Sequence, residues 1–373
     1  MIQKELSHQE RAQWLRLSRS SGIGPLTFNQ LLTRYGTAEE AIKAIPKLSE
    51  KGKGGKRRIQ LAELYDIERE LDDSEALGVR LLAKCEPAYP ALLRAIPDPP
   101  PVISVRGDIG LAKEGGVSLV GARNASAAGR RMTAELAREL GDRGLTIVSG
   151  MARGIDGAAH QASLATGTVA VLAGGVDNVY PPQHQELYEE IVDRGCVLSE
   201  VKLGKVATAR DFPRRNRIVS GLCRGVIVVE AAIRSGTLIT ARLALEQGRE
   251  VFAVPGSPLD PRCEGTNKLI REGATLIRDV DDVMESLQQF SYHVEEHQPY
   301  EYDHDGSSAP SETERAALRN TLLEILSFTP THRDILIRDS DAPPNHVADV
   351  LLDLVLSGEI EETSGGNFIL SAD

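Results

Sequence analysis

A series of short apolar runs, most of them bounded by glycine, fills the middle of the chain. Between Cys85 and Leu287 these runs are VISVRG, VSLVG, LTIVSG, GTVAVLAGG, CVLSE, GVIVVEA and EVFAVPG. Helical patterns lie between them, at residues 127–142, 158–165, 183–193 and 238–247. Val- and Ile-rich strands that alternate with helices indicate a parallel sheet covered on both faces. The sequence therefore predicts an α/β fold with a doubly wound, Rossmann-like sheet.

Glycine, hydroxyl and arginine side chains follow directly after several of these predicted strands. The segments are ARNAS at 122–126, MARGID at 151–156, VDN at 176–178 and AIRSGT at 232–237. Ligands of such sheets bind beyond the carboxyl ends of the strands. Free N–H groups and the helix dipole at the start of each following helix favour negative charge. These turns together predict a site for a phosphate-bearing ligand.

The segment from Lys205 to Arg224 carries six Lys or Arg residues and one Asp, in a chain whose formal net charge is −11. Its RRNR cluster at 214–217 is followed by Ile218-Val219, so the segment should pack on a core. Guanidinium groups held on a packed element suit phosphate and base recognition. The alternative is a solvated helix face with structural ion pairs. Because the cluster is expected near the strand ends that attract phosphate, we interpret it as one wall of a binding groove. The acidic net charge does not exclude such a groove, because salt screens the distant charges.

Both ends of the chain show patterns of small helical domains around a central domain predicted at 85–290. Residues 1–84 contain helices and the turn Gly22-Ile23-Gly24-Pro25, which resembles a helix-hairpin-helix (SAM-like) turn, although a plain helical turn with a glycine cap is the alternative. Residues 291–312 read as a polar linker. Residues 313–373 show three helices, then two short strands around a Gly-Gly turn, as in a winged helix. Because this end is strongly acidic, a protein-interaction or regulatory role is favoured over duplex binding.

The sequence lacks the motifs of several enzyme and membrane classes. It has no G-x-x-x-x-G-K-[ST], H-E-x-x-H or G-x-S-x-G, and its four cysteines form no C-x-x-C pair. No apolar run approaches the ~18 residues that span a bilayer. Asp156 and His160 could share a helix face and orient a base, but such a pair is more often local structure. We therefore expect a cytoplasmic protein with no catalytic residues, no cofactor, no metal and no membrane partner.

Seven motifs resemble, in the same order, those of the DNA-processing protein A (DprA/Smf) family. They are SLVGAR, IVSGMARGID, VAVLAGGVDNVYP, FPRRNRIVSGL, VVEA followed by SGTLITA, REVFAVPG, and EGTNKLIREGA. The resemblance covers nearly all of residues 85–290, and both chain ends resemble the longer members. It implies a protein without enzymatic activity that binds single-stranded DNA in natural transformation and recombination. Such proteins protect incoming strands, act as homodimers and help load the RecA recombinase on DNA covered by single-strand binding protein.

The resemblance also implies individual site residues. Arg123 matches the arginine of the family's V-G-[SA]-R motif, which enters the DNA pocket. The implied DNA-binding residues are Arg123, Ser149, Gly150, Gly154, Lys202, Arg214, Arg215, Asn216, Arg217, Ser235, Gly236 and Thr237. The implied dimer surface lies within residues 266–274 and includes Asn267, Leu269 and Ile270.

Two positions depart from the family pattern. Gly167 stands where the family commonly has a lysine, and Lys202 replaces the proline of S-E-x-P-x-G. One phosphate contact is therefore expected to be missing, with Lys202 or Lys205 as its substitute. Phe212 and Tyr180 are the aromatic residues expected near the pocket. The alternative function is a nucleotide- or NAD-processing hydrolase on a related fold. That alternative needs a glutamate after the Gly-Thr motif, and this chain has none in SGTLIT.

Overall fold

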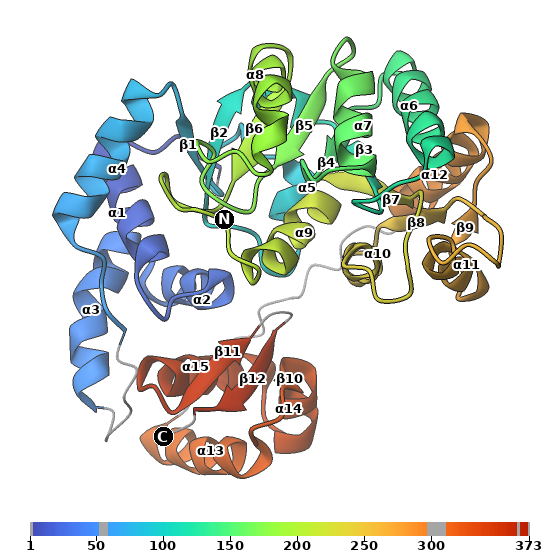
Figure 1. Ribbon diagram of the computed structural model, residues 1–373. Helices are drawn as coiled ribbons and strands as arrows, with labels where there is room; N and C mark the ends of the chain where they lie inside the picture. The colour runs from blue at the N-terminus through green and yellow to red at the C-terminus, as the bar shows by residue number, and fades with distance from the viewer. Residues whose placement is uncertain (1–2, 52–58, 297–310, 364–365, 372–373) are drawn as a thin grey trace. The chain divides into compact units, whose positions relative to one another are not determined.

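The computed structural model describes residues 3–51, 59–296, 311–363 and 366–371. The chain divides into two compact units. One contains the elements from β1 to α12, and the other contains α1 to α3 and the elements from α13 to β12 (Figure 1). No helix of the described residues is long and apolar enough to cross a membrane.

A nine-stranded sheet organises the first unit, in the order β1-β2-β6-β5-β4-β3-β7-β8-β9. The strands are β1 (Arg80–Ala83), β2 (Val102–Gly107), β3 (Gly116–Val120), β4 (Ile147–Ser149), β5 (Thr168–Val171), β6 (Cys196–Ser199), β7 (Cys223–Val228), β8 (Glu250–Ala253) and β9 (Thr275–Leu276). The α-helices are α5 (Ala91–Arg94), α6 (Ala127–Asp142), α7 (Ile155–Ser163), α8 (Gln185–Arg194), α9 (Asp211–Gly221), α10 (Thr237–Glu246), α11 (Glu264–Arg271) and α12 (Val280–Glu296). The 3-10 turns are η1 (Ile109–Ala112) and η2 (Pro182–His184).

The predicted doubly wound sheet is confirmed, with one correction. Neighbouring strands in the stretch β6-β5-β4-β3-β7-β8-β9 of the sheet pair in parallel. Strand β2 instead runs antiparallel to β6, with Ser104 opposite Ser199. The sequence of a segment such as VISVRG does not indicate the direction of its strand, because its apolar residues are buried in either direction. The sheet also begins at β1, before residue 85, and α12 continues past residue 290. Residues 297–310 of the predicted linker lie outside the described residues.

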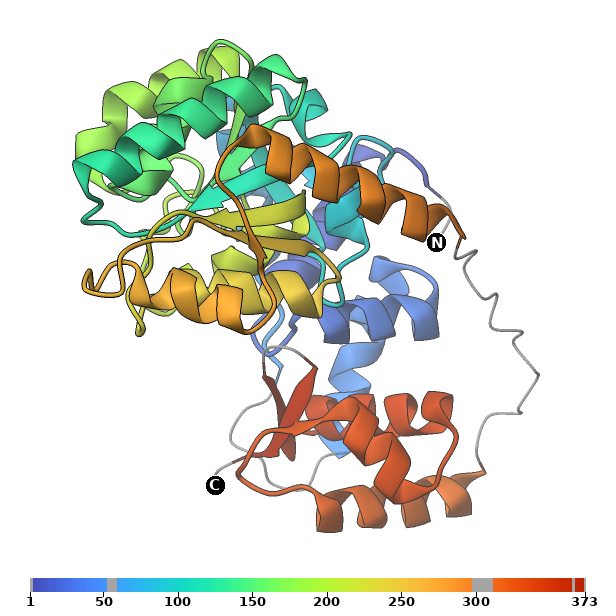
Figure 2. The same ribbon diagram turned by 90° about the vertical axis from the view of Figure 1, so that its right-hand side faces the viewer.

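Side chains alternate between two apolar layers, one on each face of the sheet. Val226 and Val228 of β7 belong to a buried cluster that includes residues of α9 and α10, such as Ile218 and Ala241. The intervening Ile227 belongs to the opposite cluster, which includes residues of α6, α7 and α12. Figure 2 shows α12 running beside α6 on that face. Burying each large aliphatic side chain contributes about 1.5–3 kcal/mol, so both faces are strongly fixed.

The winding of the sheet reverses beside β3. The chain passes from β3 through α6 to β4 on one side, whereas β7 pairs with the other edge of β3 and leads through α10 to β8. At such a reversal the connecting helices diverge from neighbouring strands and leave a crevice at the carboxyl ends. The carboxyl ends of β3 and β7 are therefore the place in this fold where a ligand is expected.

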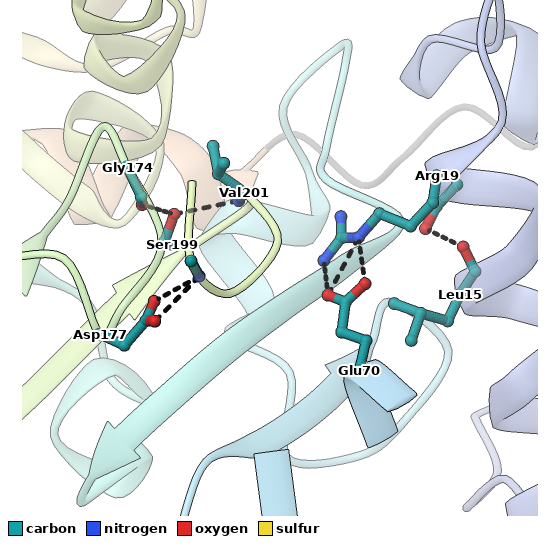
Figure 3. Close-up of polar contacts among 9 residues, drawn as sticks. Leu15, Arg19, Glu70, Gly174, Asp177, Ser199 and Val201 are labelled. Atoms are coloured by element: carbon teal, nitrogen blue, oxygen red, sulfur yellow. Dashed lines mark hydrogen bonds and ion pairs between the residues drawn. The ribbon is translucent and has the colours of Figure 1, made fainter. Parts of the chain in front are cut away.

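The N-terminal part of the second unit is a helical hairpin followed by a further helix. Its helices are α1 (His8–Arg19), α2 (Pro25–Tyr35) and α3 (Ala38–Lys51), and α4 (Leu64–Ala76) leads toward the first unit. Gly22 has φ +83°, a conformation that favours glycine, and the rings of Trp14 and Phe28 pack 5.0 Å apart between α1 and α2. Arg19 of α1 binds the Glu70 carboxylate through Nε and Nη2 (Figure 3).

The C-terminal part of the second unit is the predicted winged helix. Its elements are α13 (Glu312–Ile325), β10 (Thr331–His332), α14 (Arg333–Ser340), α15 (Pro344–Leu356), β11 (Ile360–Thr363) and β12 (Asn367–Leu370). The strands pair antiparallel in the order β10-β12-β11, and β10 was not predicted from the sequence. Leucine and valine residues of α15 pack with Phe368 of β12 and Leu322 of α13 in one core.

Candidate functional site

A cavity of about 230 Å³ opens at the reversal point beside β3. It is lined from β3 and the loop after it by Gly121 and Arg123, from α9 by Phe212 and Asn216, and from the start of α10 by Gly236. Seven of the predicted site residues line it: Arg123, Gly150, Arg215, Asn216, Ser235, Gly236 and Thr237. Three of the four predicted strand-end turns and the basic helix, which are distant in the sequence, thus meet at one cavity, whereas the turn at 176–178 does not line it.

Helix α9 begins at a network centred on Asp211. The Asp211 carboxylate accepts hydrogen bonds from the backbone N–H and the hydroxyl of Thr208, at 2.8 and 2.7 Å, and pairs with Lys205 Nζ at 3.0 Å. Burial alone would raise the pKa of Asp211, but these bonds outweigh it and lower the pKa. Lys205 is therefore engaged in starting α9. Its expected role as a substitute phosphate ligand is not favoured by this arrangement.

The RRNR cluster divides between two sides of α9. Arg215 and Arg217 are buried, whereas the Arg214 side chain is 61% exposed and Asn216 lines the cavity. Arg215 donates from Nη1 to the backbone carbonyls of Gly150 and Val171, at the ends of β4 and β5. Burial lowers the pKa of Arg215 to about 10, partly offset by the nearby Asp156 carboxylate, so the group stays charged at neutral pH. Arg215 therefore places a permanent positive charge at the cavity wall.

Arg217 is held by two carboxylates. Its Nε lies 3.2 Å from Asp98 Oδ2, and its Nη2 pairs with Glu200 at the end of β6. Glu200 also lies 3.9 Å from Arg214 Nε, so this carboxylate contacts two arginines of the cluster. Burial raises the pKa of Asp98, although Arg217 opposes that rise. Arg217 does not line the cavity, and its charge is compensated inside the protein.

Arg123 joins an aromatic pair at the cavity mouth. Its guanidinium lies 5.1 Å from the centre of the Phe212 ring, within the range of a cation–π contact. Tyr180 meets the same ring edge to face at 5.4 Å and is 47% exposed. The two aromatic residues expected near the pocket thus lie together. Flat rings beside a guanidinium offer a surface on which a base can stack.

The start of α10 contributes the opposite wall. Ser235 Oγ accepts from the Thr237 N–H at 3.2 Å and bonds the Thr237 hydroxyl at 3.0 Å. Gly236 is exposed, and a side chain there would meet no atom within 4 Å, so the space in front of this helix end is open. The helix dipole and the uncovered backbone together favour a negatively charged ligand.

Two glycines of the predicted site allow neighbouring backbone or side-chain atoms to approach closely. A Cβ at Gly154, which has φ +80°, would lie 2.2 Å from the carbonyl oxygen of Ala122, next to Arg123. A Cβ at Gly150 would lie 2.5 Å from Arg215 Nη1. Gly154 does not itself line the cavity, and Ser149 is buried with its hydroxyl bonded to the Leu119 carbonyl at 2.6 Å. Gly154 and Ser149 therefore position the loop and the strand end, whereas Gly150 lines the cavity and leaves room for Arg215.

The two positions that depart from the family pattern lie in different places. Gly167 precedes β5, at the amino ends of the parallel strands, whereas the cavity lies at their carboxyl ends. Gly167 does not line this cavity, and the expected loss of a phosphate contact there stays a prediction. Lys202 is exposed in the loop after β6.

A hydrogen-bond network fixes the loop that carries Lys202. Asp177 accepts from the Gly204 N–H at 3.0 and 2.9 Å, and Ser199 Oγ donates to the Gly174 carbonyl at 2.6 Å (Figure 3). The Val201 N–H in turn donates to Ser199 Oγ at 3.0 Å. The loop between β6 and α9 is therefore tied to the loop after β5.

The buried titratable groups near the cavity have structural partners. The Asp156 carboxylate accepts from the Ala152 N–H at 3.2 Å, and burial raises its pKa against the opposing effect of Arg215. His160 is buried 2.8 Å from Thr168 Oγ1, and burial lowers its pKa to about 3. Glu230 accepts from the backbone and hydroxyl of Ser126, the cap of α6. The pairing of Asp156 with His160 as an oriented base is thus not formed.

The residues of the predicted dimer surface lie on α11. The Asn267 amide bonds the backbone N–H and carbonyl of Gly256, at 3.3 and 3.0 Å, and Leu269 packs partly against the core. Ile270 is half-buried. The sequence did not single out Leu259 before α11 or Leu276 of β9, which are 93% and 43% exposed. A single leucine in a loop or in a two-residue strand shows no helix or strand periodicity in the sequence.

Comparisons with known proteins match all three parts of the chain. The chain matches the family described as DNA recombination-mediator protein A over residues 80–288. It also matches a DprA-like N-terminal HHH domain over residues 8–72 and a DprA winged helix domain over residues 306–366. It is 36% identical to Protein Smf of Synechocystis over 299 residues, which cover 76% of this chain and 74% of that protein. It is 39% identical to Protein Smf of Escherichia coli over 281 residues, 74% of each chain.

Solved structures show the same likeness. The X-ray structure of DNA processing protein A from Streptococcus pneumoniae aligns with a TM-score of 0.62 and 30% identity, over 76% of this chain and 98% of that one. DNA processing protein A from Helicobacter pylori, described for its single-stranded DNA binding mode, aligns with a TM-score of 0.51 and 27% identity. That alignment covers 59% of this chain and 97% of the other.

Proposed function

This chain belongs to the DNA recombination-mediator protein A family, and we propose that it binds single-stranded DNA in the cavity beside β3. The observation that carries the proposal is the meeting of Arg123, the Phe212–Tyr180 pair and the open start of α10 at one cavity. Phosphates are attracted by the cations and the helix end, and bases stack on the aromatic faces. The Helicobacter pylori relative described as binding single strands supports the same choice of ligand.

The same proposal assigns each predicted residue a role. Arg123, Asn216 and the Ser235–Thr237 turn contact the strand. Arg214 of α9 and Lys202 of the loop after β6 contribute as exposed cations outside the cavity lining. Arg215 contributes charge from within, and Arg217, Gly150, Gly154 and Ser149 hold the walls in place.

A salt titration tests the proposal. For single strands, log K falls with log salt by a slope of about −0.7 per neutralised phosphate, so three or four contacts give roughly −2 to −3. Arg123→Ala should weaken binding and make the slope shallower by about 0.7, because one phosphate contact is lost. The matched control is Arg138→Ala, an exposed arginine of α6 outside the cavity lining. A flat salt response, or equal affinities for both variants and the parent chain, would contradict the proposal.

The cellular role we propose is protection of incoming single strands and loading of RecA recombinase during natural transformation and recombination, in the cytoplasm. The test is the rate at which RecA covers a strand already coated by single-strand binding protein. The chain should raise that rate and Arg123→Ala should not. A raised rate with the variant would separate loading from DNA binding in this cavity.

We also propose a homodimer through α11, with Asn267 shaping the surface and Leu269 and Ile270 contributing apolar area. Ile270→Asp should shift the mass measured by light scattering from dimer to monomer, because a buried carboxylate is costly. The control is Leu64→Asp on α4, where the leucine is 44% exposed. A dimer that survives Ile270→Asp places the interface elsewhere.

The alternative function, hydrolysis of a nucleotide or NAD, is tested by incubation with AMP or NAD and detection of the released base. Asp156 is the carboxylate in the cavity lining, and its bond to the Ala152 N–H indicates that it orients the loop. We expect no base release. Release that disappears in Asp156→Asn would favour the hydrolase instead.

A further inference from the structure

Two leucines of α15 are buried although they do not belong to the core cluster of the winged-helix domain. Leu352 and Leu356 are 1% and 2% exposed, yet the core cluster of this domain takes its α15 residues from other faces of the helix, such as Leu351 and Leu354. Asp349 and Asp353 share the face of Leu352 and Leu356, since the four lie three and four residues apart. Within the domain, Asp349 and Asp353 lie 3.6 and 3.7 Å from Arg315 of α13. The burial of Leu352 and Leu356 nevertheless requires a partner outside the winged-helix core, for the face that we call the acidic face of α15.

The partner is the N-terminal helical hairpin of the same chain. Helices α2 and α3 contact α15, and Arg34 Nη1 of α2 lies 2.5 Å from Asp353 Oδ1. Both side chains are about a quarter exposed, at 24% and 28%. The pKa of Arg34 is raised, because the bond to Asp353 outweighs the burial that would lower it. A positive charge of the hairpin thus meets the acidic face of α15.

The strands β11 and β12 form the wing of the winged helix, and β11 makes a second contact with α2. Thr27, in the first turn of α2 and 1% exposed, donates its hydroxyl to Glu362 Oε2 of β11 at 2.6 Å. A carboxylate at the first turn of a helix is favoured by the helix dipole, as a phosphate would be. Glu362 therefore occupies a position at the hairpin that is electrostatically suited to a nucleic-acid backbone.

We propose that the winged-helix domain is an acidic cap on the chain's own helical hairpin. In helix-turn-helix proteins the recognition helix enters the major groove of a duplex. Here the acidic face of α15 docks instead on α2 and α3, and Glu362 covers the first turn of α2. A polyanion that approaches the hairpin must displace the cap. That last step extends the proposed binding of DNA from the cavity beside β3 to the hairpin, whereas the docking itself does not depend on DNA binding.

Zero-length cross-linking tests the docking. In the full chain carrying Arg34→Lys, a carbodiimide should join position 34 to Asp353 by an amide bond, which mass spectrometry of the digested monomer identifies. Glu362→Gln in that background keeps both reacting groups but loses a charge-assisted hydrogen bond, so the initial cross-linking rate should fall about tenfold. The matched control is Asp339→Asn on α14, which removes one negative charge from an exposed pair with Arg338. It should leave the rate unchanged.

Three outcomes overturn the proposal. Absence of the cross-link, or its appearance only between two copies of the chain, removes the intramolecular cap. Equal rates in Glu362→Gln and Asp339→Asn would show that Glu362 does not stabilise the docking.

Heparin is the polyanion probe, and it should slow cross-linking severalfold at low salt because it competes for the hairpin. A rate that heparin leaves unchanged overturns the competition. Oligo-dT is added separately, and if it alone has no effect and does not bind, the proposed DNA site fails while the cap stands.

Discussion

Neighbouring arginines of α9 have opposite environments. The Arg217 side chain is 7% exposed between Asp98 and Glu200, whereas Arg214 is 61% exposed. A charge that is buried with its partners leaves them uncompensated when it is removed, and a charge in water does not. The two positions should therefore respond differently to the same substitution.

We predict that Arg217→Met lowers the free energy of unfolding by about 3 kcal/mol or more, because Asp98 and Glu200 lose their counter-charge in the interior. Arg214→Met should change it by less than about 0.5 kcal/mol and should weaken binding of single strands at low salt. Urea unfolding and fluorescence anisotropy measure the two effects. Equal losses of stability in both variants would show that the buried cluster does not form.

His160 predicts a pH dependence of stability. Burial lowers its pKa from 6.5 to about 3, so the folded chain keeps the ring neutral while the unfolded chain takes up a proton below pH 6.5. The stabilisation is fully present above pH 6.5 and is lost as the pH falls toward 3, by up to ~1.4 kcal/mol per pH unit. In His160→Gln the unfolding free energy should fall less steeply between pH 6 and 4. Parallel curves for the two proteins would contradict this assignment.

The sequence predicted that the RRNR cluster lies on a packed helix, but not which arginines turn inward. That choice depends on the rotation of α9 about its axis, which is set by the Asp211 network and by contacts with Asp98, far away in the chain. Neither contact has a local signature. The position of Arg123 was predictable, because a residue directly after a strand in this fold lies at the ligand edge.

At the scale of elements, the loop between β3 and α6 depends on the glycine before α7. We predict that Gly154→Ala lowers stability by about 2 kcal/mol or more and weakens binding of single strands, because its Cβ would lie 2.2 Å from the Ala122 carbonyl and push the Arg123 loop. Gly144→Ala is the matched control, since Gly144 has a similar φ of +83° and open space around it. The control should cost about 1 kcal/mol and leave binding unchanged. Comparable binding by both variants would show that the loop does not need this close approach.

Most elements of the sheet could be predicted because buried strands bounded by glycine have a strong pattern. The exceptions were β1 and β9, of four and two residues, which are too short to show a period. The antiparallel direction of β2 was also hidden, since direction is decided by the connection and not by composition. The winged helix was predicted from helix and turn signals, but the partner of its acidic face was not, because two buried leucines on a helix read as ordinary core.

At the scale of the whole molecule, acidic and basic surfaces lie in one chain of net charge −11. We predict that the full chain carrying Asp353→Asn with Glu362→Gln binds oligo-dT severalfold more tightly at low salt than the chain carrying Asp334→Asn with Asp339→Asn. Both changes remove two negative charges, so a difference reports release of the hairpin rather than a change in overall charge. The difference should shrink above about 0.5 M salt, where screening is strong. Anisotropy titrations at two salt concentrations measure it, and equal affinities at low salt would argue against a cap that limits DNA binding.

The charge of Arg215 has a consequence for the conditions in which the cavity works. Because the guanidinium is buried against two backbone carbonyls, it cannot swing into solvent, and its pKa of about 10 keeps it ionised through the physiological range. It is also out of reach of enzymes that modify exposed side chains. The cavity thus has a fixed positive charge, and under the proposed binding of DNA any regulation of affinity must act on the outer cations, such as Arg123 and Arg214. If single strands bind as proposed, changes at the outer cations alter how a strand is held, while the attraction from Arg215 stays constant.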